Sequence, residues 1–202
     1  MKWCPLNNIL NSRFYEILDK ITNFFFLNIL WLLCSLPLIT LFPATAAMFG
    51  VFKDWVQGKE GNLFKSFWNY FKTNFKHSFI YGIIWFLSLF IFYIDFALIS
   101  EFESYNFILT SLLFLLLILV AFNTIYFTPV NIHFDVNLFG KIKNSFLFSI
   151  MFFPTTILSL LICGFVIASI IFVPQVIFII FSPAGYVIFR LCYRTFIKVG
   201  KG

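Results

Sequence analysis

Charged residues are scarce in this sequence, which excludes an ordinary water-soluble globule. Only 11% of its 202 residues are charged, against 61% apolar residues and a mean hydropathy of +0.97. Four long segments contain no charge inside their ends, at residues 21–52, 77–95, 105–134 and 145–189. Because a spanning helix needs about 20 mostly apolar residues, these segments predict a membrane protein with about five crossings.

Reactive motifs are equally scarce. The four cysteines form no CxxC pair and have no histidine at metal-ligand spacing, so we interpret them as small apolar residues. The two histidines, His77 and His133, each stand at the end of an apolar segment. The sequence contains no Gly-rich phosphate loop, no HExxH and no Ser, His and Asp constellation. We therefore predict that the protein is not an enzyme and holds neither a metal ion nor a cofactor.

The apolar segments predict an all-α polytopic membrane helical bundle that occupies residues 1–202 as one domain. Five transmembrane helices are predicted, at residues 22–41, 78–99, 106–127, 146–172 and 176–193. Three amphipathic helices are predicted at the membrane interface, at residues 9–21, 44–56 and 63–76. In the last of them, aromatic residues recur at helical spacing with lysines on the other side, which is typical of a helix at an anionic headgroup layer.

Prolines and glycines predict where the helices end. Pro37 removes a backbone donor and clashes with the preceding turn, so the first span is expected to kink or stop just before it. Pro43 suits the first turn of a new helix. Pro129 is expected to close the third span, and Gly140 to mark a turn inside a polar loop at residues 131–143.

Lysine and arginine counts near the span ends predict the orientation. With five crossings, eleven of the fourteen basic residues fall on one side, which is therefore cytoplasmic. This orientation places the C-terminus inside and the N-terminus outside. If residues 44–56 instead dip back as a re-entrant hairpin, or another segment crosses, the N-terminus moves inside. The net charge of +6 follows from this asymmetry, so the sequence indicates the lipid bilayer as a partner and no nucleic acid.

One stretch carries a family resemblance. Residues 28–40 read Asn28-Ile-Leu-Trp31-Leu-Leu-Cys-Ser-Leu-Pro37-Leu-Ile-Thr40, and Pro43-Ala-Thr45-Ala-Ala47 follows. Further on come Trp55 and Gly58, and then Phe71-Lys72-Thr73-Asn74-Phe75-Lys76. This pattern resembles the signature of the YesL-like family of bacterial integral membrane proteins, a family defined by a domain of unknown function. The resemblance implies a protein of the bacterial cell membrane, often associated with carbohydrate uptake and degradation, for which no reaction is established.

The candidate functional residues are polar or helix-breaking positions at membrane depth: Asn28, Trp31, Pro37, Thr40, Pro43, Thr45, Asp95 and Asn123. Pro37 and Pro43 free backbone groups, and a membrane tolerates irregular backbone only where protein buries it or a wet cavity adjoins it. Two interpretations stay open. Either this is a kinked helix whose freed groups Thr40 and Thr45 satisfy, or a ligand or partner binds at the break.

The later spans add two candidates of a different kind. Asp95 is the only acidic residue inside a predicted span, and such residues are functional hypotheses by default. Its place one turn from an acidic segment also fits a hydrated position at the outer interface. Asn123 and Thr124 lie late in the third span, where we expect them to form interhelical hydrogen bonds.

Three functions remain as hypotheses. The first is a non-catalytic accessory or regulatory component of bacterial carbohydrate uptake that binds subunits of a sugar transporter, and the lack of reactive residues favours it. The second is a small transporter or channel with a path at the break between Pro37 and Thr45. The third, an enzyme acting on lipid or lipid-linked sugar, would need several acids or histidines at the interface, and Asp95, Glu101 and Glu103 are too few.

Overall fold

The computed structural model describes the backbone of residues 5–59, 61–99 and 106–199. Within these residues it contains α-helices and 3-10 turns and no strand. The elements are α1 (Pro5–Ser35), η1 (Leu38–Thr40), α2 (Leu41–Val56), α3 (Leu63–Ile99), α4 (Asn106–His133), α5 (Leu138–Met151), α6 (Phe153–Phe172), η2 (Pro174–Val176) and α7 (Ile177–Val199). Among the described segments, five are long and apolar enough to cross a membrane: Ile17–Ser35, Leu63–Ala97, Ile108–His133, Phe153–Phe172 and Pro174–Val199. The predicted all-α membrane fold is confirmed.

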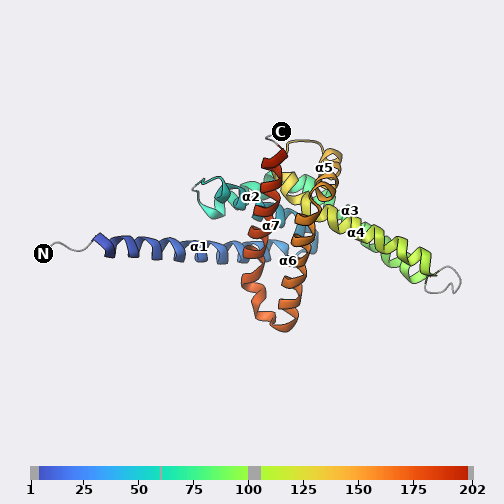
Figure 1. The fold of residues 1–202 in the computed structure, drawn as a ribbon, viewed down its shortest axis with the longest axis horizontal. Coiled ribbons are helices and arrows are strands. Elements are labelled where there is room, and N and C mark those ends of the chain that lie inside the picture. Colours follow the sequence, from blue (N-terminus) through green and yellow to red (C-terminus); the bar gives the residue numbers. More distant parts are fainter. Residues whose placement is uncertain (1–4, 60, 100–105, 200–202) are drawn as a thin grey trace.

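The helices form three projections around a central body (Figure 1). The N-terminal part of α1 extends to one side, the α3–α4 pair extends to the other, and the α6–α7 hairpin points away from both. Helices α2 and α5 lie in the body. Helix α2 contributes more residues to the main cluster of buried apolar residues than any other helix, and α1, α3, α4 and α7 contribute the rest. Segments far apart in the sequence therefore meet around α2.

Helices α1 and α2 form an antiparallel pair joined by a break at residues 36–40. The Phe24 and Trp55 rings meet at a centroid distance of 4.9 Å, and Trp31 is hydrogen-bonded to Thr45 nearer the break. The helix predicted to span residues 22–41 thus ends earlier, at Ser35. The interfacial helix predicted at residues 9–21 is not a separate element but the first part of α1, because no Pro or Gly interrupts the chain there.

Helix α2 lies inside the protein, which corrects the interfacial position predicted for residues 44–56. Nearly every residue from Phe42 to Phe52 is buried. Small residues permit this burial, since they let helix backbones approach closely. Gly50 lies so close to the Tyr70 ring of α3 that a Cβ atom would overlap the ring. Apolar residues occur on every side of α2, which is typical of a buried helix rather than an amphipathic one.

Helix α3 joins two elements that the sequence analysis separated, the interfacial helix at residues 63–76 and the span at residues 78–99. No Pro or Gly stands between them, so the helical hydrogen bonds continue. The connection before α3 contains Gly58, whose φ of 67° lies in the left-handed region that favours glycine. This turn ends α2 and allows α3 to pack beside it.

Helix α4 continues through Pro129 to His133, so the proline does not close the third span as predicted. A proline inside a helix removes one hydrogen bond, here to the Ile125 carbonyl, and packing against neighbours can compensate for it. The polar loop predicted at residues 131–143 shrinks to residues 134–137. Gly140 lies inside α5, because the Asn137 side chain caps that helix by accepting the Gly140 N–H at 3.1 Å.

The span predicted at residues 146–172 is divided between two helices. Helix α5 ends at Met151 and α6 begins at Phe153, with Phe152 between them at φ −111° and ψ 47°. Pro154 explains the division, because it lacks an N–H and clashes with the carbonyl four residues earlier. The last predicted span, at residues 176–193, extends to Val199 in the structure.

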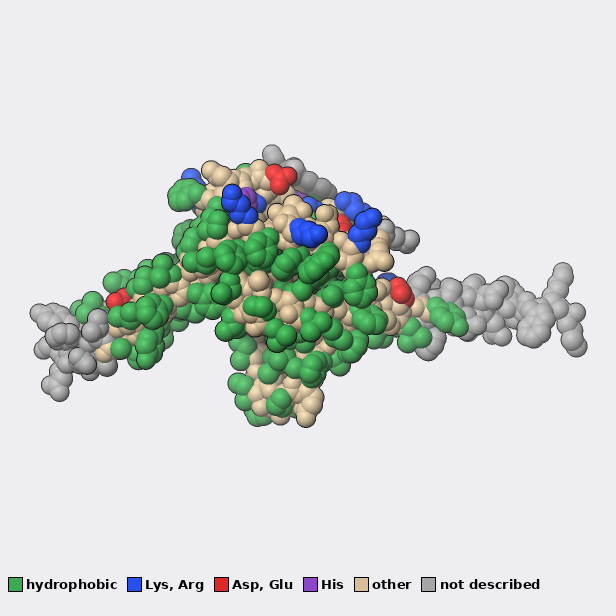
Figure 2. All heavy atoms as spheres, turned by 180° about the vertical axis from the view of Figure 1, so that it is seen from behind, with side chains coloured by type: hydrophobic (Ala, Val, Ile, Leu, Met, Phe, Trp, Pro, Cys, Tyr) green, Lys and Arg blue, Asp and Glu red, His purple; other side chains and the backbone are tan. Residues whose placement is uncertain are grey.

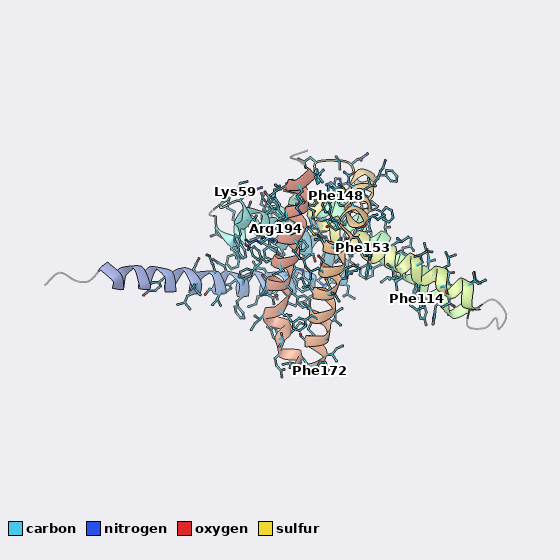
Figure 3. All side chains as sticks on the ribbon, in the orientation of Figure 1. Lys59, Phe114, Phe148, Phe153, Phe172 and Arg194 are labelled. Atoms are coloured by element: carbon cyan, nitrogen blue, oxygen red, sulfur yellow. The ribbon has the colours of Figure 1, made fainter. Side chains whose placement is uncertain are left out.

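Basic residues gather at one end of the molecule, while hydrophobic side chains cover much of the remaining face (Figure 2). Lys59 and Arg194 lie toward this end, and Phe172, at the tip of the α6–α7 hairpin, lies at the opposite end (Figure 3). This separation of charge is what lysine and arginine asymmetry across a membrane produces.

Candidate functional site

The residues of the helix break form hydrogen bonds with one another. The Thr40 hydroxyl lies 2.6 Å from the Cys34 carbonyl oxygen and 2.7 Å from that of Pro37, so its hydrogen is shared between the two. The Thr40 N–H also donates to the Pro37 carbonyl at 2.8 Å. These carbonyls lie where α1 runs out of backbone donors. Thr40 therefore supplies the hydrogen bonds that the kinked-helix interpretation requires.

Trp31 and Thr45 connect the two helices that flank the break. Trp31 Nε1 donates to Thr45 Oγ1 at 3.0 Å, and Thr45 Oγ1 donates to the Leu41 carbonyl at 2.7 Å. The Trp31 ring also packs on Phe181 of α7, at a centroid distance of 4.4 Å. Pro43 is buried in the first turn of α2. The aromatic and hydroxyl residues of the signature thus hold α1, α2 and α7 together.

Asn28 is fully buried and holds α1 against the beginning of α7. Its Nδ2 donates to the Ile177 carbonyl at 3.0 Å, and its Oδ1 accepts the Ser182 N–H at 3.0 Å. A side-chain amide offers a donor and an acceptor together. Because a bilayer supplies no water to pair backbone groups, this one residue stabilises two of them at membrane depth.

Asn123 connects three helices, and Thr124 strengthens one of these connections. The Tyr81 hydroxyl of α3 donates to Asn123 Oδ1 at 2.9 Å, and Asn123 Nδ2 donates to the Ile142 carbonyl of α5 at 2.9 Å. Trp85 Nε1 of α3 donates to Thr124 Oγ1 at 3.1 Å. The interhelical hydrogen bonds expected at Asn123 and Thr124 are therefore present.

Asp95 lies apart from the break. It is half-buried on α3 and lines a cavity of about 440 Å³ together with Tyr81, Trp85, Ser88 and Asn123. Within the described residues the structure records no hydrogen bond or ion pair for its carboxylate. Of the eight candidates, Asp95 and Asn123 share this cavity, and the other six surround the α1–α2 break and its contacts with α7.

A second hollow lies beside the break, and we call it the signature groove. It has a volume of about 470 Å³, and its polar and aromatic lining residues include Trp31, Phe42, Thr45, Trp85, Thr128 and Phe181. Trp31 engages the Thr45 hydroxyl, whereas no partner among the described residues is recorded for the Thr128 hydroxyl. The groove is mainly apolar, and most of its few polar atoms already form hydrogen bonds within or between helices.

A cluster that the sequence analysis missed surrounds Lys141 of α5, which is only 4% exposed. Its Nζ donates to His77 Nδ1 and to Asn131 Oδ1, both at 2.8 Å. Asn131 Nδ2 in turn donates to Ser78 Oγ at 2.9 Å. Because an ammonium group only donates, His77 Nδ1 is the acceptor and the proton of the neutral ring lies on Nε2. The cluster connects α3, α4 and α5.

Burial lowers the pKa of Lys141 below its ordinary value of 10.5, and the negative charge of Asp135 opposes that shift. Lys53 of α2 behaves similarly, because burial is the main cause that lowers its pKa. The Lys53 Nζ donates to the Ile132 carbonyl at 2.9 Å, near the end of α4. Both lysines are therefore held by neutral acceptors of neighbouring helices.

One sequence signal could have revealed the cluster. Lys141, Ser145 and Ser149 recur every four residues, and all three are buried. In a membrane protein such a polar stripe faces other helices rather than lipid. Lys141 was predicted to lie in the polar loop at residues 131–143, so this periodicity was not apparent. Within the described residues, no group of three or more His, Cys, Asp or Glu is placed to hold a metal ion.

Comparison with known proteins gives three matches. Residues 24–96 match a family model described as a protein of unknown function, DUF624. The chain is 31% identical over 193 residues to the uncharacterized protein YteU of Bacillus subtilis (strain 168), which covers 93% of this chain and 87% of YteU. It is also 31% identical over 125 residues to the uncharacterized protein YesL of the same organism, which covers 60% of this chain and 59% of YesL. No solved structure matches.

Proposed function

Because the chain belongs to the YesL-like family of bacterial membrane proteins of unknown function, we propose that it is a non-catalytic accessory or regulatory component of carbohydrate uptake. The carbohydrate context rests on the family resemblance. The observation that carries the accessory role is the use of the polar side chains. The polar groups of Asn28, Trp31 and Asn123 all form hydrogen bonds between helices, so they stabilise a scaffold.

A partner surface is available on the outer part of the α3–α4 pair, which we call the arm and define as residues 83–97 and 108–120. The arm projects from the body (Figure 1). Both helices expose large apolar side chains there, among them Ile83, Leu87, Phe90, Ile91, Ile108, Leu112, Phe114 and Leu116. A projecting helix pair of this kind can lie along the helices of a transporter subunit without any change in the body.

Affinity capture tests this proposal. The tagged protein is purified in mild detergent from cells grown on a range of complex carbohydrates, and mass spectrometry identifies the proteins that accompany it. We expect permease or ATPase subunits of a sugar transporter. The double substitution Phe90→Ala and Leu116→Ala on the arm should reduce this capture, and Leu161→Ala with Phe165→Ala on exposed α6 positions should not. Recovery of the protein alone under every condition would contradict the accessory role.

We also propose that both termini face the cytoplasm, with α1 and α2 forming a re-entrant pair. The support is that Asp19 and Lys20, in the middle of α1, line the same pocket as Lys59, which follows α2, so this part of α1 and the end of α2 lie on one side. This is the re-entrant alternative of the sequence analysis, not the five-crossing orientation. It brings all fourteen Lys and Arg residues to the cytoplasmic side. A reporter that works only in the cytoplasm should be active when it is fused to the N-terminus. An inactive reporter would instead support an external N-terminus.

A small transporter or channel is the second candidate, because the signature groove adjoins the break between Pro37 and Thr45. Transporters commonly bind substrates where helices are discontinuous. Flux measured in liposomes containing the purified protein tests it directly. Sugar flux that Thr45→Val reduces, while the amount of folded protein stays constant, would favour this function over the accessory role.

A further inference from the structure

A pocket of about 700 Å³ lies between α1, the chain that connects α2 to α3, and α7. We call it the boundary pocket, and its charged and polar lining residues are Asp19, Lys20, Asn23, Lys59 and Tyr186. Both lysines are exposed at its rim. The described lining residues contribute one carboxylate and two ammonium groups, which together give a net positive charge.

Three aromatic rings form one wall of the boundary pocket. The Phe24 ring lies 4.9 Å from the Trp55 ring and 5.5 Å from the Tyr186 ring, and the Trp55 and Tyr186 rings are 6.3 Å apart. Trp and Tyr concentrate at the boundary between the hydrocarbon and the headgroups of a membrane. Lysines beside them are the residues that contact headgroup phosphates at that depth. The wall and the rim together indicate a position at the membrane boundary.

An apolar groove of about 510 Å³ shares the Phe24 ring with this pocket. Its lining includes Ile21, Phe25, Phe26, Ile179 and Pro183, and we call it the side groove. Phe25, Phe26 and Ile179 are exposed although they are large and apolar. A charged pocket and an apolar groove thus meet at one side chain, between α1 and α7. This pairing matches the two ends of an amphipathic molecule.

We propose that the two cavities together bind one anionic phospholipid, with its phosphate in the boundary pocket and an acyl chain in the side groove. Lys20 and Lys59 donate to the phosphate oxygens. Asn23 Nδ2 donates to one oxygen of Asp19 at 3.0 Å, which orients the carboxylate and leaves its other oxygen to accept a headgroup hydroxyl. Phosphatidylglycerol meets both requirements. Phosphatidylcholine has no hydrogen-bond donor for Asp19 and no net charge to match the pocket.

The bound lipid would connect three parts of the chain. Lys20 belongs to α1, Lys59 to the connection after α2, and Tyr186 to α7. A lipid in this position adds contacts between the re-entrant pair and the α6–α7 hairpin. The occupancy of the site would therefore follow the anionic lipid content of the membrane.

Native mass spectrometry of the purified full-length protein tests the site. The protein is mixed with equal amounts of phosphatidylglycerol and phosphatidylcholine, and the retained lipid is counted. We expect selective retention of phosphatidylglycerol. Since each lysine near anionic lipid contributes about 1 kcal/mol, Lys20→Gln with Lys59→Gln should lower retention by about tenfold or more. The matched pair Lys65→Gln and Lys72→Gln removes the same charge from exposed positions of α3 and should leave retention within about twofold.

Two further measurements examine the rest of the site. Phe25→Ala should lower phosphatidylglycerol retention severalfold, and Phe90→Ala on the arm should not. Glycerol 1-phosphate, which carries the headgroup without a chain, should not displace the lipid. An equal loss in both lysine pairs would overturn the proposal, since it would mean a diffuse charge effect. Displacement by glycerol phosphate would also overturn it, because the ligand would then be a soluble phosphate.

Discussion

The α1–α2 pair and the arm are both apolar helix pairs, yet different forces hold them. In the α1–α2 pair, Trp31 and Thr45 form a hydrogen bond between the helices, and Asn28 binds the backbone of α7. In the arm, rings such as Phe92 and Phe114 meet at a centroid distance of 6.3 Å, and most side chains stay exposed. Regular helices satisfy their own backbone and tolerate lipid contact, whereas a broken helix needs polar partners inside the protein.

The close packing of α2 within the α1–α2 pair is the sharpest feature of this comparison, and glycine substitutions test it against an exposed position of α6. Gly50→Ala would drive a Cβ atom into the Tyr70 ring, whereas a Cβ at Gly164 on α6 meets no atom within 4 Å. Overpacking costs up to about 3 kcal/mol, so Gly50→Ala should produce the largest loss of stability. This loss is measured as the change in the unfolding transition when sodium dodecyl sulfate is added to mixed micelles, with circular dichroism as the readout. An unchanged transition for Gly50→Ala would show that α2 is not packed against α3.

Asn28→Leu tests the polar half of the comparison. The leucine keeps a similar volume but removes the side-chain hydrogen bonds to the Ile177 carbonyl and the Ser182 N–H. Interhelical hydrogen bonds in membranes contribute up to about 1.7 kcal/mol each, so a loss of about 2 kcal/mol is expected. The control is Asn69→Leu, at an exposed position of α3. Equal effects of the two variants in the same unfolding assay would mean that the Asn28 hydrogen bonds are not formed.

Lys141→Met tests the cluster at the base of the α3–α4 pair, where the arm joins the body. The substitution leaves His77 Nδ1 and Asn131 Oδ1 without a donor, so a loss of about 1 kcal/mol at pH 7 is expected. The exposed Lys143→Met is the control. These two variants are compared in the same micelle assay.

The pH dependence of Lys141→Met has a defined sign. The folded protein holds the pKa of Lys141 below the unfolded value near 10.5, so between the two values the unfolded chain binds more protons. The stability of the wild-type protein should therefore rise relative to Lys141→Met as the pH increases toward 10.5. A difference that stays constant from pH 7 to pH 10 would mean that burial does not shift this lysine.

The sequence predicted the class of fold because hydrophobic length is a local property. It also placed the break at Pro37, since a proline acts on its own turn. It did not predict that α2 is buried, because burial depends on which helices surround it. The continuation of α4 through Pro129 depends on neighbours in the same way. The boundary predicted at residues 76–78 was wrong for a local reason, because no Pro or Gly stands there and α3 continues through these residues.

The candidate site was predicted unevenly for a related reason. Trp31, Thr40, Thr45 and Asn123 are polar positions within apolar segments, and the structure gives each of them hydrogen bonds that hold helices in place. Lys141 was missed because a lysine near a helix end usually faces water. Its burial depends on His77 and Asn131, which are distant in sequence. The spacing of Lys141, Ser145 and Ser149 indicates that this side of α5 is buried, but it does not identify the partners on other helices.

Asp95→Asn should have the smallest effect on stability. It tests whether a polar residue of the arm contributes to the folded structure. Within the described residues no partner of the Asp95 carboxylate is recorded, so its removal should change the free energy of unfolding by less than about 0.5 kcal/mol. Asn123→Leu, which lies on the same cavity but removes two hydrogen bonds, provides the contrast. If Asp95→Asn destabilises the protein as much as Asn123→Leu, the Asp95 carboxylate has a partner within the protein and the comparison fails. If stability is unchanged while capture of transporter subunits falls, the carboxylate acts on a partner, because nothing within the protein would then depend on it.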